Sequence, residues 1–317
     1  MRPAQVVYRS WPSMNKRFKV AAAQLTPITF DMQACVSKIC DYVDDAANKG
    51  AQLVVFGETC IGGYPGWRPH ILTYADEDFF KKESEWVSKK LFKVSEPIPG
   101  PSTEKLCKKA RDQGVFIVTG FDEADARQTG TIYNSSLIIG PDGTILGKHR
   151  KLHLGSLELA YWKKGSFEDL RIFQTSLAKF GLAICYDALF PEYTRLLDLM
   201  GEEIQCQLWA TSVGYDTCSN YLPVARAMEG GVFVVSSCLV GKDELTGFEY
   251  AGESKIVDPF GRTISMANRG NEEIIYGEIN LDRILDYRSS GSFTLGMDRR
   301  EDLYDLSLIE HSRKSAR

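Results

Sequence analysis

The sequence has no long apolar run, no cysteine pair and no excess of positive charge. About 20 consecutive apolar residues are needed to cross a bilayer, and the 317 residues contain no such run. The net charge of −4 supplies no positive field for nucleic acid or anionic lipid. We therefore expect neither a membrane nor a nucleic acid among the partners of this chain.

The eight cysteines are single residues, at positions 35, 40, 60, 107, 185, 206, 218 and 238. None forms a Cys-x-x-Cys pair, so no thiolate cluster indicates zinc. Most lie inside apolar stretches, as small core residues do. Residues 1–17 carry charges without an apolar block, which is not the pattern of a secretory signal. We expect a reduced, cytoplasmic protein.

Apolar stretches of strand length alternate with amphipathic stretches of helix length. Strands are predicted at 18–25, 52–56, 115–120, 132–139, 145–147, 179–185, 206–210, 232–236 and 274–279. Helices are predicted at 32–48, at 79–92, from a cap at Ser102 to Gln113, at 193–200 and at 222–229.

These βα units recur in two halves, and each half ends in a β-hairpin with a Pro-x-Gly turn, at 141–143 and 259–261. Two sheets with helices on their outer faces would bury this set of strands. The predicted fold is α/β, a four-layer α-β-β-α sandwich with two stacked mixed sheets and helices on both outer faces. It forms a single domain at 18–308. An arm at 1–17, disordered or packed on a neighbouring subunit, precedes it, and a polar tail at 309–317 follows.

Two charged side chains follow predicted strands, where α/β proteins often place functional groups. Glu58 comes just after the short, mostly apolar strand predicted at 52–56. Burial there would raise its carboxyl pKa and suit a general base, although a helix cap or a surface acid has the same pattern. Lys151 follows the first hairpin and could stabilise developing negative charge, or belong to a solvated basic turn.

A third reactive side chain ends a strand. Cys185 closes the apolar stretch 179–185 and precedes a turn with Pro191. Such an elbow exposes a thiol among backbone N–H groups, which lower a thiol pKa and can bind an oxyanion. A buried structural cysteine is the alternative, and Cys206 and Cys238, inside strands, illustrate it.

Together these segments resemble the nitrilase superfamily of carbon–nitrogen hydrolases over nearly the whole chain. The resemblance lies in Phe-Gly-Glu-Thr around Glu58, Gly-Lys-His-Arg-Lys-Leu around Lys151 and Gly-Leu-Ala-Ile-Cys-Tyr-Asp around Cys185. The segment Arg-Ala-Met-Glu-Gly at 226–230 also matches. Three such motifs in this order are far more specific than any one of them.

The resemblance implies a hydrolase that needs no cofactor and no metal. Cys185 would attack the substrate carbon and form a thioester. Glu58 would act as general base, and Lys151 with the backbone N–H of Tyr186 would hold the oxyanion. Glu158 matches a second family glutamate that positions the substrate and the lysine; the alternative is an exposed loop acid.

The motifs give mixed indications about the substrate. The segments 58–67 and 151–162 resemble nitrile-cleaving relatives, but those relatives usually have Cys-Trp-Glu at the nucleophile. Here Cys-Tyr-Asp at 185–187, with Phe-Pro-Glu at 190–192, resembles amidases and carbamoylases. Because these residues adjoin the reacting centre, the sequence favours ammonia release from a small or medium amide, with a nitrile as the alternative.

Aromatic side chains near the motifs could line a pocket for a neutral substrate, and core packing is the alternative for each. They are Tyr64, Trp67, Trp162, Trp209 and Tyr215, with Tyr64 and Trp209 as the main candidates. The resemblance also implies a homodimer built on 193–200 and 222–229, or a larger homo-oligomer.

Other functions would use the same residues differently. His149 and His153 are spaced i, i+4 and could bind a metal together with Glu158, as in a metallohydrolase. Lys151 between them, after a strand, argues against a helix there. Cys185 could instead use a histidine as its base, or the chain could be an inactive scaffold.

Overall fold

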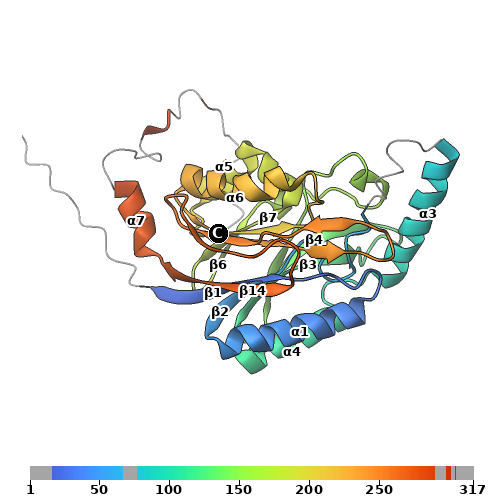
Figure 1. The fold of residues 1–317 in the computed structure, drawn as a ribbon, viewed down its shortest axis with the longest axis horizontal. Coiled ribbons are helices and arrows are strands. Elements are labelled where there is room, and N and C mark those ends of the chain that lie inside the picture. The colour runs from blue at the N-terminus through green and yellow to red at the C-terminus, as the bar shows by residue number, and fades with distance from the viewer. Residues whose placement is uncertain (1–15, 67–76, 290–297, 301–303, 305–317) are drawn as a thin grey trace, which may run out of the picture.

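The computed structural model describes residues 16–66, 77–289, 298–300 and 304. The prediction of two stacked mixed sheets covered by helices is confirmed (Figure 1). Three central strands run parallel in each sheet, and the outer strands are antiparallel to their neighbours. Among the described residues, no helix has the length and apolar character that a membrane span requires.

The first sheet has the order β14-β1-β2-β3-β4-β5 and the second the order β13-β12-β9-β8-β7-β6. The first sheet contains β1 (Arg17–Gln24), β2 (Ala51–Val55), β3 (Phe116–Ala124), β4 (Ile132–Ile139), β5 (Ile145–Arg150) and β14 (Glu273–Asn280). The second contains β6 (Ile172–Gln174), β7 (Lys179–Ile184), β8 (Ile204–Trp209), β9 (Phe233–Cys238), β12 (Lys255–Val257) and β13 (Thr263–Met266). A separate ribbon consists of β10 (Val240–Lys242) and β11 (Glu249–Ala251).

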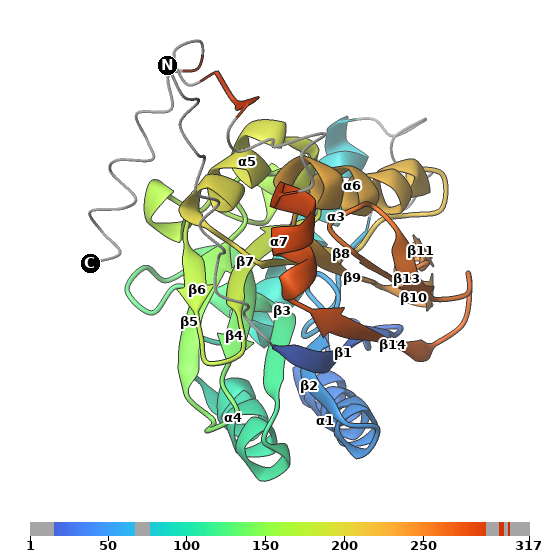
Figure 2. The same ribbon diagram turned by 90° about the vertical axis from the view of Figure 1, so that its left-hand side faces the viewer.

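Helices cover both outer faces of the pair of sheets (Figures 1 and 2). The α-helices of the described residues are α1 (Met32–Asn48), α3 (Glu77–Val94), α4 (Pro101–Gln113), α5 (Pro191–Met200), α6 (Asp216–Gly230) and α7 (Asp282–Ser289). The described residues also form three short 3-10 helices, which are η1 (Glu158–Ala160), η2 (Phe167–Asp169) and η3 (Cys185–Leu189). Both views place α1 and α4 against the first sheet and α5 and α6 against the second.

The two-residue period of β1 divides its side chains between two cores. Val20 and Ala22 point into the layer between the sheets, whereas Ala21 and Ala23 point outward and pack with α1. A strand buried on both faces reads as a continuous apolar run, which is why this segment shows no alternation. The stacking of the two sheets brings the ends of β2, β5, β7 and β8 close together.

Some predicted boundaries are wrong. Gly100, not Ser102, is the N-cap of α4; Pro101 occupies the first turn, where its fixed φ favours a helix start. Helix α6 begins at Asp216 and continues through Pro223, earlier than predicted. Residue 17 belongs to β1, while the rest of the predicted arm, apart from residue 16, and the tail at 309–317 lie outside the described residues.

Candidate active site

Glu58 lies in a tight turn just after β2. The next residue, Thr59, has φ +40°, a left-handed conformation that costs a residue with a side chain about 1–2 kcal/mol. Gly120 of β3 makes room for this turn, because a Cβ at position 120 would lie 2.2 Å from the Thr59 backbone nitrogen. The Glu58 side chain is fully buried.

Three donors from separate parts of the chain hold the Glu58 carboxylate. Oε1 accepts from Asn134 Nδ2 at 2.8 Å and from Lys151 Nζ at 2.6 Å. Oε2 accepts from the backbone N–H of Ala210 at 3.1 Å. Burial raises the pKa of Glu58, Lys151 opposes this, and the nearby Glu158 carboxylate adds to it, so the pKa is raised overall. A carboxylate with a raised pKa is a stronger base.

Lys151 follows β5 and connects two glutamates. Its ammonium lies 2.6 Å from Glu58 Oε1 and 2.6 Å from Glu158 Oε1, and its side chain is buried. Burial lowers the pKa of Lys151, but Glu158 and Glu58 more than compensate, so the pKa lies well above its ordinary value. The lysine is therefore a fixed positive charge. Tyr64 donates to the same Glu158 oxygen at 3.1 Å, and the backbone N–H of Gly155 donates to the other at 2.7 Å.

Cys185 is the first residue of η3, directly after β7, and has φ +44°. This sharp strand-to-helix turn is the elbow predicted from the sequence. The expected lowering of the thiol pKa is wrong, because burial raises it well above its ordinary value; the Glu58 carboxylate raises it further, and Lys151 opposes this. The resting group is thus a neutral thiol beside a carboxylate that can accept its proton. Tyr186, in the first turn of η3, has a backbone N–H of the kind that a helix start leaves without an internal partner.

The structure thus brings Glu58, Lys151, Glu158 and Cys185 together. The two histidines considered as metal ligands or bases lie elsewhere: His149 Nε2 and His153 Nδ1 are 2.9 Å and 2.8 Å from the carboxylate of Asp187. In the described part of the chain, no group of three His, Cys, Asp or Glu side chains could hold a metal ion.

The aromatic candidates fall into different surroundings. Tyr64 touches Glu158, whereas Trp162 packs in a small core and donates to Asp122 at 2.9 Å. Trp209 is fully buried in the core cluster against which Cys185 also packs, and its part in substrate binding stays a prediction. Tyr215 is 72% exposed, and Trp67 lies outside the described residues.

Several residues that hold Glu58 in place were not predicted from the sequence. Asn134 interrupts the apolar strand 132–139, and a polar residue at a buried strand position is a signal that could have marked it. Gly120 inside a strand is a similar sign of close backbone approach. No local pattern marks Ala210, because only its backbone N–H contributes.

The chain is similar to known proteins over most of its length. The family model described as carbon–nitrogen hydrolase matches residues 19–289. A nitrilase from Pyrococcus abyssi is 32% identical over 287 residues, or 90% of this chain and 98% of that protein. The omega-amidase NIT2 of Xenopus tropicalis is 29% identical, over 86% of this chain and 91% of its own length.

Solved structures show the same fold. Nit3 of Saccharomyces cerevisiae, a member of branch 10 of the nitrilase superfamily, superposes with a TM-score of 0.73 at 26% identity, covering 90% of this chain and 97% of that one. An amidase from Nesterenkonia shares the fold with a TM-score of 0.67 at 20% identity, over 91% of this chain and 95% of its own. The chain therefore belongs to the carbon–nitrogen hydrolase family, in the nitrilase superfamily, and is an enzyme of that class.

Proposed function

We propose that this enzyme hydrolyses a small or medium amide to a carboxylic acid and ammonia through a thioester on Cys185. One observation carries the proposal. The Glu58 carboxylate accepts a hydrogen bond from the Lys151 ammonium at 2.6 Å and lies close enough to the Cys185 thiol to raise its pKa, so that a nucleophile, a base and a positive charge lie around one point.

In the first half-reaction, Glu58 takes the thiol proton as the Cys185 sulfur attacks the amide carbon. Because the thiol pKa is raised, deprotonation is expected to accompany attack. The carbonyl oxygen becomes an oxyanion, which Lys151 and the backbone N–H of Tyr186 stabilise. As the C–N bond breaks, Glu58 returns the proton to the leaving nitrogen, and ammonia departs from a thioester.

In the second half-reaction, a water molecule attacks the thioester carbon and Glu58 accepts its proton. The second oxyanion uses the same donors. Its collapse breaks the C–S bond, and the proton on Glu58 returns to the sulfur of Cys185. The balance is one amide and one water consumed, and one acid and one ammonia released. Covalent catalysis of this type divides one difficult step into two easier ones.

A nitrile is the second candidate substrate. Relatives named nitrilase, such as the Pyrococcus abyssi protein at 32% identity, support it. Attack on a nitrile carbon would give a thioimidate, and a second water would be consumed before the acid is released. The segment Cys-Tyr-Asp at 185–187 favours the amide, since it resembles the corresponding segment of amidases.

An ammonia-release screen with paired amides and nitriles of the same side chain tests the proposal. We expect turnover of the amides, and loss of that turnover in Cys185→Ala with the fold retained by circular dichroism. With a slow substrate, mass spectrometry of acid-quenched enzyme should detect an acyl adduct on the peptide that contains Cys185. Turnover of nitriles alone would select the second candidate, and activity retained in Cys185→Ala would refute both.

We further propose a homodimer or larger homo-oligomer built on α5 and α6, in a reducing cytoplasmic environment. Support for the assembly comes from Tyr221 and Met228 of α6, which are 71% and 45% exposed. Support for the environment comes from the eight cysteines, all of which are free thiols. Sedimentation showing only monomers would refute the assembly, and thiol titration finding disulfides in protein from cells would refute the environment.

A further inference from the structure

Asp187 joins the two chain segments that carry the nucleophile and the lysine. It lies two residues after Cys185 in η3 and is fully buried. Its Oδ1 accepts from the backbone N–H of His153 at 2.9 Å and of Leu152 at 3.2 Å. These are the two residues after Lys151, so one carboxylate connects the Cys185 elbow to the end of β5.

Two imidazoles also contact this carboxylate, and the backbone N–H of Ile184 donates to Oδ2 at 3.4 Å. His149 Nε2 lies 2.9 Å from Asp187 Oδ2, and its Nδ1 lies 3.1 Å from the backbone carbonyl of Asp169. Both neighbours accept hydrogen bonds, so both ring nitrogens must carry protons and the buried ring is an imidazolium. The Tyr193 hydroxyl also lies near the ring, but it donates to the Leu182 carbonyl at 2.5 Å.

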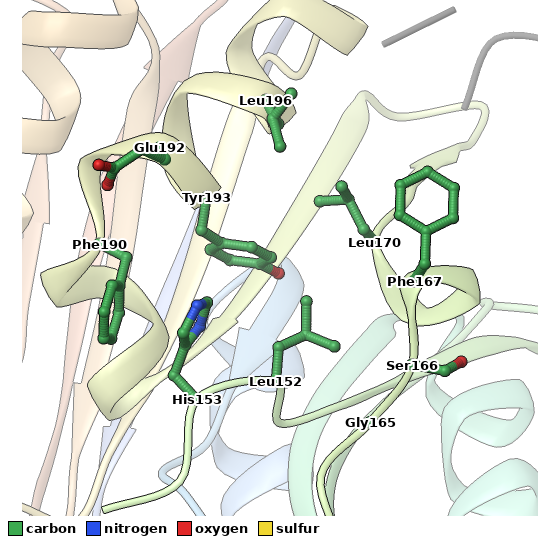
Figure 3. A pocket seen from close by; sticks show the side chains of 10 residues that line it. All are labelled: Leu152, His153, Gly165, Ser166, Phe167, Leu170, Phe190, Glu192, Tyr193 and Leu196. Atoms are coloured by element: carbon green, nitrogen blue, oxygen red, sulfur yellow. The ribbon is translucent and has the colours of Figure 1, made fainter. Parts of the chain in front are cut away.

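The second imidazole is held more loosely. His153 Nδ1 donates to Asp187 Oδ1 at 2.8 Å, and its ring stacks on Phe190 with centroids 3.9 Å apart. Figure 3 shows the ring between Phe190 and Tyr193, at the wall of a cavity of about 420 Å³. The side chain is 31% exposed, so substitutions there should leave the core intact.

We propose that Asp187, with His149 and His153, is a positioning device that sets the distance between the Cys185 sulfur and the Lys151 ammonium. The strands that carry these groups belong to different sheets, and sheets that only stack can shift relative to one another. The Asp187 carboxylate ties them with hydrogen bonds from four groups around Lys151, on residues 149, 152 and 153.

Electrostatics as well as geometry would fix the positions of the groups that Asp187 connects. An unpaired buried charge is strongly unfavourable, so Asp187 and His149 constrain each other's position. The charged groups around the pair are Lys151 and Asp169, and the hydroxyl of Tyr193 faces it from α5. A shift of about 1 Å in a catalytic group can lower a rate by about 100-fold.

The inference rests on the proposed function, because it concerns the alignment of its catalytic groups. The test compares Asp187→Asn, His153→Asn and His153→Leu with the wild type. Asparagine at 153 can place an N–H donor where Nδ1 stood, whereas leucine cannot. We expect kcat to fall at least about 10-fold in Asp187→Asn and His153→Leu with KM nearly unchanged, and His153→Asn to retain most of the kcat.

Asp142→Asn is the matched control. Asp142 also accepts from a backbone N–H, that of Thr144 at 3.0 Å, but it lies in the turn at the opposite end of β5 from Lys151. The kcat of the Asp142→Asn variant should equal that of the wild type. If Asp187→Asn does not fold, the two His153 variants still decide the question. Equal kcat in His153→Asn and His153→Leu, or a kcat in Asp187→Asn within twofold of the wild type, would overturn the inference.

A second readout separates this inference from the proposed function. The rate at which iodoacetamide alkylates Cys185, followed by peptide mass spectrometry, needs no substrate. This alkylation rate should fall in Asp187→Asn and His153→Leu, and should stay close to the wild-type rate in His153→Asn. If the wild type turned over neither amides nor nitriles but the alkylation rates of the variants differed as expected, the proposed function would fail and the positioning role would stand. Alkylation at the wild-type rate in all three variants would refute the positioning role.

Discussion

Replacing Glu58 by glutamine tests the proposed base with a minimal change of shape. In the wild type, Oε1 accepts from two donors and Oε2 from the Ala210 N–H. A glutamine has one acceptor oxygen, so its amide nitrogen must face at least one of these donors. The variant also loses the group that takes the thiol proton.

The structure allows both effects to be estimated. A buried donor left unpaired costs about 1–3 kcal/mol. Lys151 keeps its second partner, Glu158, at 2.6 Å, so the cost should fall within that range and the protein should fold. Loss of general acid–base catalysis typically lowers a rate by about 10²–10⁴-fold, and we expect kcat to fall accordingly.

The assay is ammonia release at saturating substrate, with urea unfolding measured on the same samples. Glu123→Gln is the matched control, because Glu123 is also buried and paired with two cations, Lys148 and Arg150, outside the catalytic cluster. It should lose stability without losing kcat per folded molecule. A Glu58→Gln enzyme with more than a tenth of the wild-type kcat would refute the assignment of Glu58 as the base.

Other predictions follow from single contacts. Gly120→Ala would place a Cβ 2.7 Å from the Glu58 carbonyl carbon; overpacking should cost about 1–3 kcal/mol and lower kcat, as urea unfolding and ammonia release would show. Tyr64→Phe should lower kcat/KM by removing the hydrogen bond at 3.1 Å, whereas Trp209→Phe, in the core, should change it little; the reverse order would place Trp209 at the substrate. Burial lowers the pKa of His149, but Asp187 and the Asp169 carbonyl raise it above its ordinary 6.5 overall. The contribution of the charged His149 to the free energy of unfolding is therefore complete below pH 6.5 and is lost as pH rises through the higher pKa of the folded state. Urea midpoints should therefore fall across this range in the wild type more than in His149→Gln, and parallel curves would contradict the imidazolium.

The sequence by itself determined the elements and the order of the motifs. The helix at 32–48 was predicted at the bounds that α1 has, because one apolar face repeats every 3.6 residues and Gly50 follows. The strand before Glu58 and the elbow at Cys185 were likewise readable, since burial and turn chemistry leave their marks within a few neighbouring residues. Local signals of this kind also indicated which reactive groups stand at strand ends.

Tertiary structure alone decided how those groups meet. The contact of Asn134 with Glu58 depends on the pairing of β3 with β4, and the Ala210 N–H reaches Glu58 from the other sheet. The interior position of Trp209 and the link from Asp187 to the chain around Lys151 depend in the same way on how the sheets stack. Strand register and sheet stacking are set by the packing of many side chains distant in sequence, so no local pattern in the chain encodes them.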